Sequence, residues 1–118
     1  MSYIDGFVIP IPENNLAAYK KMATWGRRVW MKHGALQYFE CIGDDLNQMP
    51  GCGDFKKMAK LKPGEALFFS FIIYKNKAHR DKVNKLVMAE MAKHPMPKEM
   101  PFDAKRMAFG GFKAIIQA

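Results

Sequence analysis

The chain has 118 residues, of which 49% are hydrophobic and 25% charged, so its composition is that of a globular protein and excludes a disordered or fibrous one. This length suits a single domain, residues 1–118, with one hydrophobic core. No stretch has the roughly 18 uncharged apolar residues of a membrane-spanning helix, and the first residues carry no secretion signal, so we expect a cytoplasmic protein without a membrane partner.

The net charge of +8 attracts polyanions in principle, but its distribution matters more. The basic residues divide between two predicted helices and one connection: Lys20, Lys21, Arg27, Arg28 and Lys32; Lys77, Arg80, Lys82 and Lys85; Lys56, Lys57, Lys60 and Lys62. Such a spread is typical of solvated helix faces and disfavours nucleic acid as a partner. Cys41 and Cys52 lack the spacing of a metal site or a disulfide framework, so we expect free thiols, with Cys41 buried.

Residues 3–10 are rich in β-forming residues and predict a first strand, which Pro10 and Pro12 end. A helix follows, because one set of side chains recurs at alternating steps of three and four residues and forms a stripe that would face a sheet. This stripe consists of Leu16, Tyr19, Ala23, Gly26, Trp30 and His33. Gly34 suits the left-handed position that ends a helix, and residues 35–43 predict a second strand.

Residues 44–63 are rich in Asp, Gly and Pro and predict a long loop with one short helical turn, a length typical of lids and binding loops. Residues 65–75 have the strongest β pattern in the chain and predict the third strand. A second helix over residues 78–93 and a last strand over residues 105–117 complete the series.

The order βαββαβ predicts an α+β fold of the ferredoxin-like type, a four-stranded antiparallel sheet with two helices on one face. A sheet covered on one side alternates apolar and polar residues, whereas the third strand is apolar on both sides. One side carries Leu67, Phe69, Phe71 and Ile73, and the other Ala66, Phe68, Ile72 and Tyr74. The chain has no third layer to cover the second face, so we expect a homodimer whose sheets pack face to face, a dimeric α/β barrel.

Three segments carry a family resemblance. MSYIDGFVIPIPENNLAAYKKMA, YKNKAHRDKVNKLVMAE and PFDAKRMAFGGFKAIIQ resemble the YbaA-like family of small bacterial proteins, and the similarity extends over essentially the whole chain. That family is similar in fold to the dimeric α/β-barrel superfamily, which includes antibiotic-biosynthesis monooxygenases and haem-degrading oxygenases. The resemblance implies a fold and a dimer. Because the family is a domain of unknown function, it brings no catalytic residue with it.

A few polar residues interrupt the apolar strands. If Asp5 of the first strand points away from the helices, the alternation of strands allows Tyr38, Glu40, Ser70 and Lys113 to share its face. Lone charges there would be costly unless they pair or line a wet cavity. We therefore expect a pocket between sheet and partner, with Asp5 and Glu40 as candidate catalytic groups and the other three as ligand-binding residues. The alternative is a set of interface salt bridges.

His79 opens the second predicted helix and is a third catalytic candidate, because related superfamily members sometimes place a functional histidine there, near the active cavity. The adjacent Arg80 is a candidate to bind an anionic ligand. The alternative is a capping or core histidine beside a surface arginine. No two histidines stand four residues apart with a carboxylate, so we expect no metal and no cofactor.

Three classes of function stay open at this point. The first is a homodimer that binds a small molecule, either as a binding protein or as a cofactor-independent enzyme such as an oxygenase or isomerase. The second is an RNA-binding module, although the third strand lacks the basic and glycine-rich signature of that class. The third is a structural dimer with a filled interface. Neither the substrate nor whether the chain is an enzyme follows from the residues.

Overall fold

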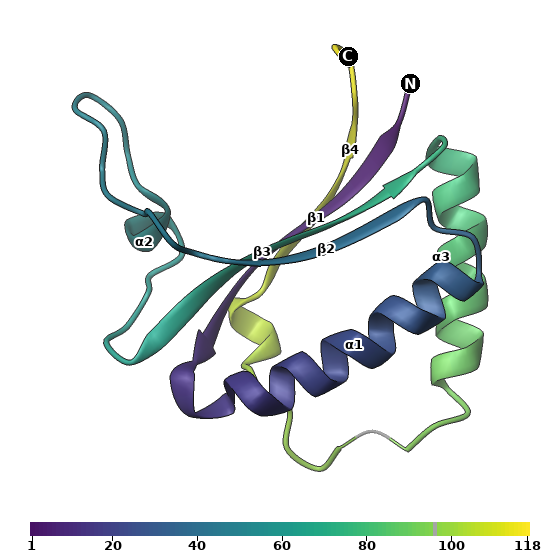
Figure 1. The fold of residues 1–118 in the computed structure, drawn as a ribbon, viewed down its shortest axis with the longest axis horizontal. Helices are drawn as coiled ribbons and strands as arrows, with labels where there is room; N and C mark the ends of the chain where they lie inside the picture. Colours follow the sequence, from purple (N-terminus) through teal and green to yellow (C-terminus); the bar gives the residue numbers. More distant parts are fainter. Residues whose placement is uncertain (96) are drawn as a thin grey trace.

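The computed structural model of the protein describes residues 1–95 and 97–118. Four strands form one antiparallel sheet in the order β2-β3-β1-β4, and the two long helices lie on the same side of that sheet (Figure 1). The elements are β1 (Tyr3–Pro12), η1 (Glu13–Asn15), α1 (Leu16–Lys32), β2 (Gln37–Ile42), α2 (Phe55–Met58), β3 (Glu65–Tyr74), α3 (Lys77–Met91), η2 (Ala104–Arg106) and β4 (Ala108–Lys113). The predicted α+β class and the antiparallel sheet of four strands are confirmed.

The core lies between the sheet and the two long helices. Tyr19, Gly26 and Val29 of α1 and Val83 and Val87 of α3 are buried there. They pack with the side chains that alternate onto the helix side of the two central strands, namely Asp5, Phe7, Ile9 and Ile11 of β1 and Phe68, Ser70, Ile72 and Tyr74 of β3. The stripe predicted for the first helix therefore does face the sheet.

β1 is longer than predicted, because it continues through Pro10 to Pro12. Its pairing with β3 extends over the whole strand, whereas its pairing with β4 ends at Val8. Beyond Val8, β1 thus has a neighbour on one side only. Proline lacks the backbone N–H, and a strand with one free side tolerates that loss, which is why the prolines do not end the strand.

β4 is shorter than predicted, because residues 104–106 form a 3₁₀ turn and pairing stops at Lys113. The turn is capped by Asp103, whose carboxylate accepts a hydrogen bond from the backbone N–H of Lys105 at 3.0 Å. Within the strand, a Cβ at Gly111 would stand only 2.8 Å from Nη2 of Arg80. Glycine at this position therefore permits a close approach of β4 to the side chain of α3.

The connection between β2 and β3 contains the predicted helical turn, α2, and projects beyond the end of the sheet, away from α1 and α3 (Figure 1). Leu46 and Phe55 from this connection cover Leu67 at the end of the open sheet face. Phe55 also meets Phe69 edge to face, with ring centroids 6.5 Å apart. The connection is thus anchored to the face of the sheet that the helices leave open.

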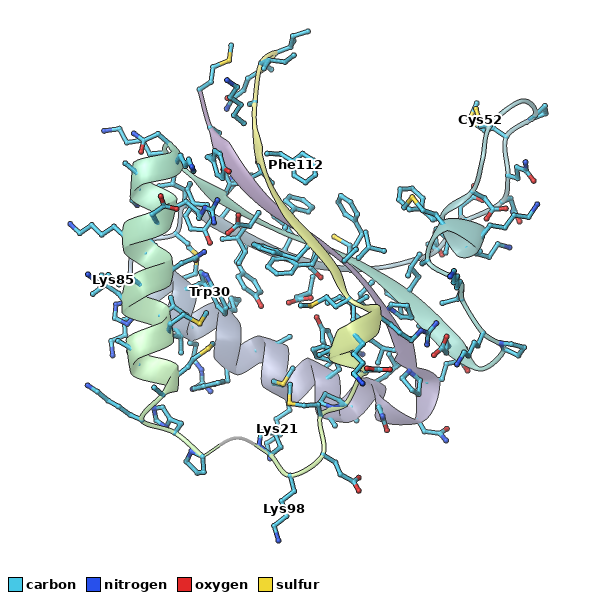
Figure 2. The ribbon with its side chains drawn as sticks, turned by 180° about the vertical axis from the view of Figure 1, so that it is seen from behind. Lys21, Trp30, Cys52, Lys85, Lys98 and Phe112 are labelled. Carbon is cyan, nitrogen blue, oxygen red and sulfur yellow. The ribbon has the colours of Figure 1, made fainter. Side chains whose placement is uncertain are left out.

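The outer faces of the helices carry solvated lysines. Lys21 of α1 and Lys85 of α3 are exposed and point away from the sheet (Figure 2), as predicted for the basic residues of these helices. Within the part of the chain that the structure describes, no helix is both long enough and apolar enough to cross a bilayer.

Candidate functional site

An apolar cavity of about 370 Å³ lies between the sheet and the two long helices. Trp30 points into this layer from α1 (Figure 2). Methionines form much of the remaining wall, namely Met22, Met88, Met91, Met100 and Met107. Phe102, together with Met100 and Met107, comes from the segment between α3 and β4, so this segment closes one side of the cavity. None of the described lining residues belongs to the connection between β2 and β3, so that loop is no lid for this cavity.

Glu40 of β2 is the one carboxylate among the described residues that line this cavity. Its Oε1 atom accepts hydrogen bonds from the hydroxyls of Tyr19 at 2.7 Å and Ser70 at 2.5 Å. Its Oε2 atom accepts a hydrogen bond from the hydroxyl of Tyr38 at 2.7 Å. We call these four residues the Glu40 cluster. Residues of α1, β2 and β3 meet in it, because Glu40 pairs with Ser70 across the strands and Tyr19 reaches over from the helix.

Both tyrosines of the Glu40 cluster keep their protons and donate them to the carboxylate. Burial and the neighbouring Glu40 carboxylate raise the pKa of the Tyr19 hydroxyl above its usual value. The same two causes raise the pKa of the Tyr38 hydroxyl. Since an unperturbed tyrosine titrates near pH 10, both hydroxyls are protonated at neutral pH and hold the carboxylate in place.

A second hollow, of about 390 Å³, lies outside the first, between α1 and the edge strand β2. Tyr19, Tyr38 and Glu40 line both hollows, so the Glu40 cluster stands between the inner cavity and the outer groove. The groove also carries Lys20 and Arg27. The carboxylate is therefore reachable from the surface without unfolding the core.

Asp5 lies in a different cluster. The hypothesis that it points away from the helices is wrong, because its side chain is only 1% exposed and faces α3. Its Oδ2 atom accepts a hydrogen bond from Nδ2 of Asn84 at 3.2 Å, and Oδ1 lies 3.6 Å from Nε of Arg80. Oδ1 of Asp5 and Nε of Arg80 have no hydrogen-bond partner among the described residues.

Asn84 joins this second cluster to the rest of the core. Its Oδ1 atom accepts hydrogen bonds from Nε1 of Trp30 and from the hydroxyl of Tyr74, both at 3.0 Å. Burial, together with the Asp5 carboxylate, raises the pKa of Tyr74, so that hydroxyl stays a donor. Arg80 in turn donates to the hydroxyl of Tyr3 at 3.0 Å. These bonds connect β1, β3, α1 and α3, an arrangement suited to fixing the helices on the sheet.

The structure brings some of the candidate site residues together and separates others. Tyr38, Glu40 and Ser70 meet in one cluster. Asp5 stands two strand spacings and two residues away from Glu40, roughly 12 Å between the Cα atoms. The expected pocket, in which both carboxylates converge between the sheet and a partner, is therefore wrong: both lie on the helix side and apart.

The other two candidates lie outside the cavity. The Nδ1 atom of His79 accepts a hydrogen bond from the backbone N–H of Lys75 at 2.9 Å, and the backbone N–H of His79 donates to Oδ1 of the capping Asn76 at 2.8 Å. These are the contacts of a helix-start histidine. Lys113 is exposed and pairs across the strands with Tyr3. Among residues 1–95 and 97–118, no group of three or more His, Cys, Asp or Glu is placed to hold a metal ion.

The side of the sheet opposite the helices carries a second apolar surface, which we call the open face. Its hollow of about 560 Å³ is lined by residues such as Ile4, Val8, Phe69, Phe71, Ala108 and Phe112. Phe69 is 48% and Phe112 63% exposed, and Figure 2 shows Phe112 beside β4. Cys41, expected to be buried, is exposed on this face in the single chain, because it pairs with Phe69 across the strands. The described residues that line this hollow include no charged side chain.

Sequence comparisons agree with the resemblance noted above. The chain is 36% identical over 116 residues to the Uncharacterized protein YbaA of Escherichia coli strain K12, a match that covers 98% of both chains. The Uncharacterized protein YbaA of Shigella flexneri matches with the same identity and coverage. A family model described as "Protein of unknown function (DUF1428)" matches residues 2–104. The chain therefore belongs to this family of proteins of unknown function.

Proposed function

We propose that this protein is a homodimer in which each subunit binds a small, mostly apolar molecule in the cavity between its sheet and its helices. The observation that carries the proposal is the Glu40 carboxylate, held by three hydroxyls in the wall of an otherwise apolar cavity of about 370 Å³. Within the site we assign Tyr38, Glu40 and Ser70 to ligand binding and add Tyr19. Asp5 and Arg80 have a structural role in this proposal, and His79 and Lys113 have none in the site.

The cavity has the character of a ligand site. Its volume lies in the range of about 300–1,000 Å³ that is typical of small-molecule pockets, which are mostly apolar with a few convergent polar groups. Methionine side chains are flexible and polarisable, and they adapt to apolar ligands of different shape. Placing a carboxylate beside apolar groups costs free energy of folding, and a side chain that only filled space would be apolar. Glu40 lines both hollows, which supports a role in contact with a ligand.

The open face supports the proposed dimer. Contiguous apolar surface of this kind marks interaction sites on soluble proteins, and Phe39, Phe69 and Phe112 are between 42% and 63% exposed on it. Two copies packed through this face would bring two sheets to about 10 Å, the spacing of packed sheets. We propose that residues 1–118 form one ferredoxin-like domain and that two such domains make a dimeric α/β barrel.

RNA binding is the main alternative for the open face, since exposed aromatic rings on a sheet also suit base stacking. A sheet that stacks bases needs basic groups beside the rings to contact phosphates. The described residues that line the open-face hollow carry no such charge. Light scattering decides between the two: a dimer mass at micromolar concentration supports the proposal, and a monomer that binds single-stranded RNA with a steep salt dependence would replace it.

The cavity is tested with a neutral fluorescent probe, N-phenyl-1-naphthylamine, titrated against the full-length protein. Ala23 lines both hollows, so Ala23→Phe fills the space and should weaken probe binding by at least about tenfold. Ala18→Phe, the same change at an exposed position of α1, is the matched control and should leave the affinity unchanged. Thermal unfolding of both variants shows that they are folded. Equal probe affinity for the wild type and Ala23→Phe would refute the cavity as the binding site.

A further inference from the structure

We infer that the cavity takes an apolar molecule with one hydrogen-bond donor, a hydroxyl or an N–H group, and that this donor binds to Oε2 of Glu40. The inference rests on the proposed small-molecule function and adds the chemical class of the ligand. It excludes apolar molecules whose polar groups are only acceptors, such as ethers, esters and ketones.

The hydrogen bonds of Glu40 leave one acceptor position open. An ionised carboxylate has about four acceptor positions, two on each oxygen. Oε1 uses both of its positions, because it accepts from the hydroxyls of Tyr19 and Ser70. Oε2 accepts from the hydroxyl of Tyr38 and therefore has one position left. Glu40 lines the cavity, so a donor on a ligand can reach it there.

The hydroxyls of the cluster offer no donor to a ligand. A hydroxyl has a single hydrogen, and the hydrogens of Tyr19, Tyr38 and Ser70 are all directed at Glu40. The raised pKa values of the two tyrosines keep these protons in place at neutral pH. What remains on the three hydroxyl oxygens is acceptor capacity. The polar patch of the cavity thus presents acceptors only, and its complement is a donor.

The rest of the wall supports the same conclusion. The described residues that line the cavity include no lysine, arginine or histidine that could bind an anionic or carbonyl group. The indole N–H of Trp30 is already donated to Asn84. The other lining indole, that of Trp25, packs edge to face against His94, with ring centroids 5.4 Å apart, and is not part of the Glu40 cluster. An acceptor-only ligand would leave its own polar atom unpaired next to the acceptors of the Glu40 cluster. A buried unpaired polar group costs about 1–3 kcal/mol, which corresponds to roughly 5- to 150-fold in affinity.

The test compares two probes of the same ring system, 2-naphthol and its methyl ether 2-methoxynaphthalene, by titration calorimetry on the full-length protein. The naphthol donates one hydrogen bond and the ether none, so the naphthol should bind at least about tenfold more tightly. An ether that binds as tightly as the naphthol overturns the inference. Naphthalen-2-ylmethanamine, protonated at neutral pH, and naphthalen-2-ylmethanol form a second pair. If the amine binds more tightly, the donor on the ligand is charged. If the alcohol binds more tightly, the donor is neutral.

Variants assign the preference to Glu40. Glu40→Gln replaces the charged acceptor with an amide that is itself a donor, so the preference for naphthol should fall to within about threefold. Glu90→Gln is the matched control, since Glu90 pairs with Lys32 and His33 and is not part of the cavity wall. Tyr38→Phe removes a competing donor from Oε2 and should keep the preference or increase it. Loss of the preference in Tyr38→Phe together with its retention in Glu40→Gln would contradict the assignment to Oε2.

The two proposals fail in different ways. If naphthol and ether bind equally and Ala23→Phe weakens both, the cavity is a binding site and only the donor inference is wrong. If neither probe binds, or if Ala23→Phe changes neither affinity, the proposed function itself is wrong. A naphthol preference that Glu40→Gln abolishes and Glu90→Gln preserves supports both.

Discussion

Both faces of the sheet are rich in apolar side chains, and they differ in what covers them. Phe68 and Phe69 are neighbours on β3 and point to opposite sides, yet Phe68 is 4% exposed and Phe69 48%. On the helix side, each polar residue of the strands has partners: Glu40 has three hydroxyls, and Asp5 has Asn84 and Arg80. The open face is also apolar, and only its end at Leu67 is covered, by Leu46 and Phe55. Exposed phenylalanines of this kind are typical of an interaction surface, which is why we propose a second copy as their cover.

The contrast also separates the two proposals. The helix side combines apolar volume with buried polar groups, which is the arrangement of a ligand site. The open face has apolar area without polar groups, which is typical of the centre of a permanent subunit interface. Each face can therefore be perturbed by itself, and the expected effects range from unfolding of the chain to a change in thiol reactivity.

The largest effect is expected from placing a charge at each of the neighbouring phenylalanines. Phe68→Glu buries an unpaired carboxylate in the core and should cost more than about 4 kcal/mol, enough to unfold the chain. Phe69→Glu places the charge on the open face and should leave a folded monomer. Circular dichroism measures folding and light scattering the mass. A Phe69→Glu protein that remains a dimer would show that the open face is not the interface.

The next effect concerns the polar cluster that only the helix side has. Ser70→Ala removes one of the three donors to Glu40 and leaves Oε1 with an unpaired acceptor position, which should cost about 1–2 kcal/mol. Ser2→Ala removes a hydroxyl that accepts from Gln117 at the exposed chain ends and should change stability by less than about 0.5 kcal/mol. Urea unfolding measures both. Equal losses would mean that the Glu40 cluster contributes no more than a surface contact.

Much of this contrast could be predicted from the residues. In the third strand, apolar residues occupy both sets of alternate positions, so the sequence predicts that both sides of the strand are apolar. The positions of the strands follow from the same kind of pattern. The alternation states which residues share a face, and it says nothing about which face the helices cover. The hypothesis that Asp5 points away from the helices is wrong for that reason, since its partner Asn84 stands 79 positions away in the chain and no local pattern indicates the contact.

The Glu40 cluster could be predicted only in part. Glu40 and Ser70 were assigned to one face by strand periodicity, and they do pair across β2 and β3. Tyr19 was assigned to the sheet-facing stripe of the first helix, but its contact with Glu40 depends on how α1 crosses the sheet. That angle is set by the packing of side chains along the whole interface. The cavity depends on the same packing, together with the segment before β4, which has no periodic pattern.

A smaller effect on stability is expected from the ion pair that holds the segment before β4 against the sheet. Arg106 of η2 forms a two-pronged ion pair with Glu65 at the start of β3, with 2.9 Å between Nη2 and Oε1. Hydrogen bonds from Arg106 lower the pKa of Glu65. Because the folded-state pKa is depressed, this stability is present above the unfolded pKa of about 4.3 and is lost as pH falls through the lower folded-state value.

Glu65→Gln should therefore cost at most about 1 kcal/mol at neutral pH, since the pair lies near the surface. The difference from the wild type should shrink as the pH falls below about 4. Urea unfolding at both pH values measures it, with Glu13→Gln at an exposed position as the control. A difference that stays constant with pH would show that the pair contributes packing and no charge interaction.

The smallest perturbation is chemical modification of the two cysteines, which leaves stability unchanged and tests directly whether the open face is covered. Cys41 and Cys52 are both exposed in the single chain, Cys41 on the open face and Cys52 in the connection that projects beyond the sheet (Figure 2). A second copy on the open face would shield Cys41 and leave Cys52 accessible, so a thiol reagent should modify Cys52 at least about tenfold faster, as accessibility controls thiol reactivity. In the Phe69→Glu monomer the two rates should converge.

Mass spectrometry of the modified peptides distinguishes modification at Cys41 from modification at Cys52. Equal rates in the wild type at micromolar concentration would place the interface elsewhere, because a sheet packed on a second sheet has no room for a reagent at its centre.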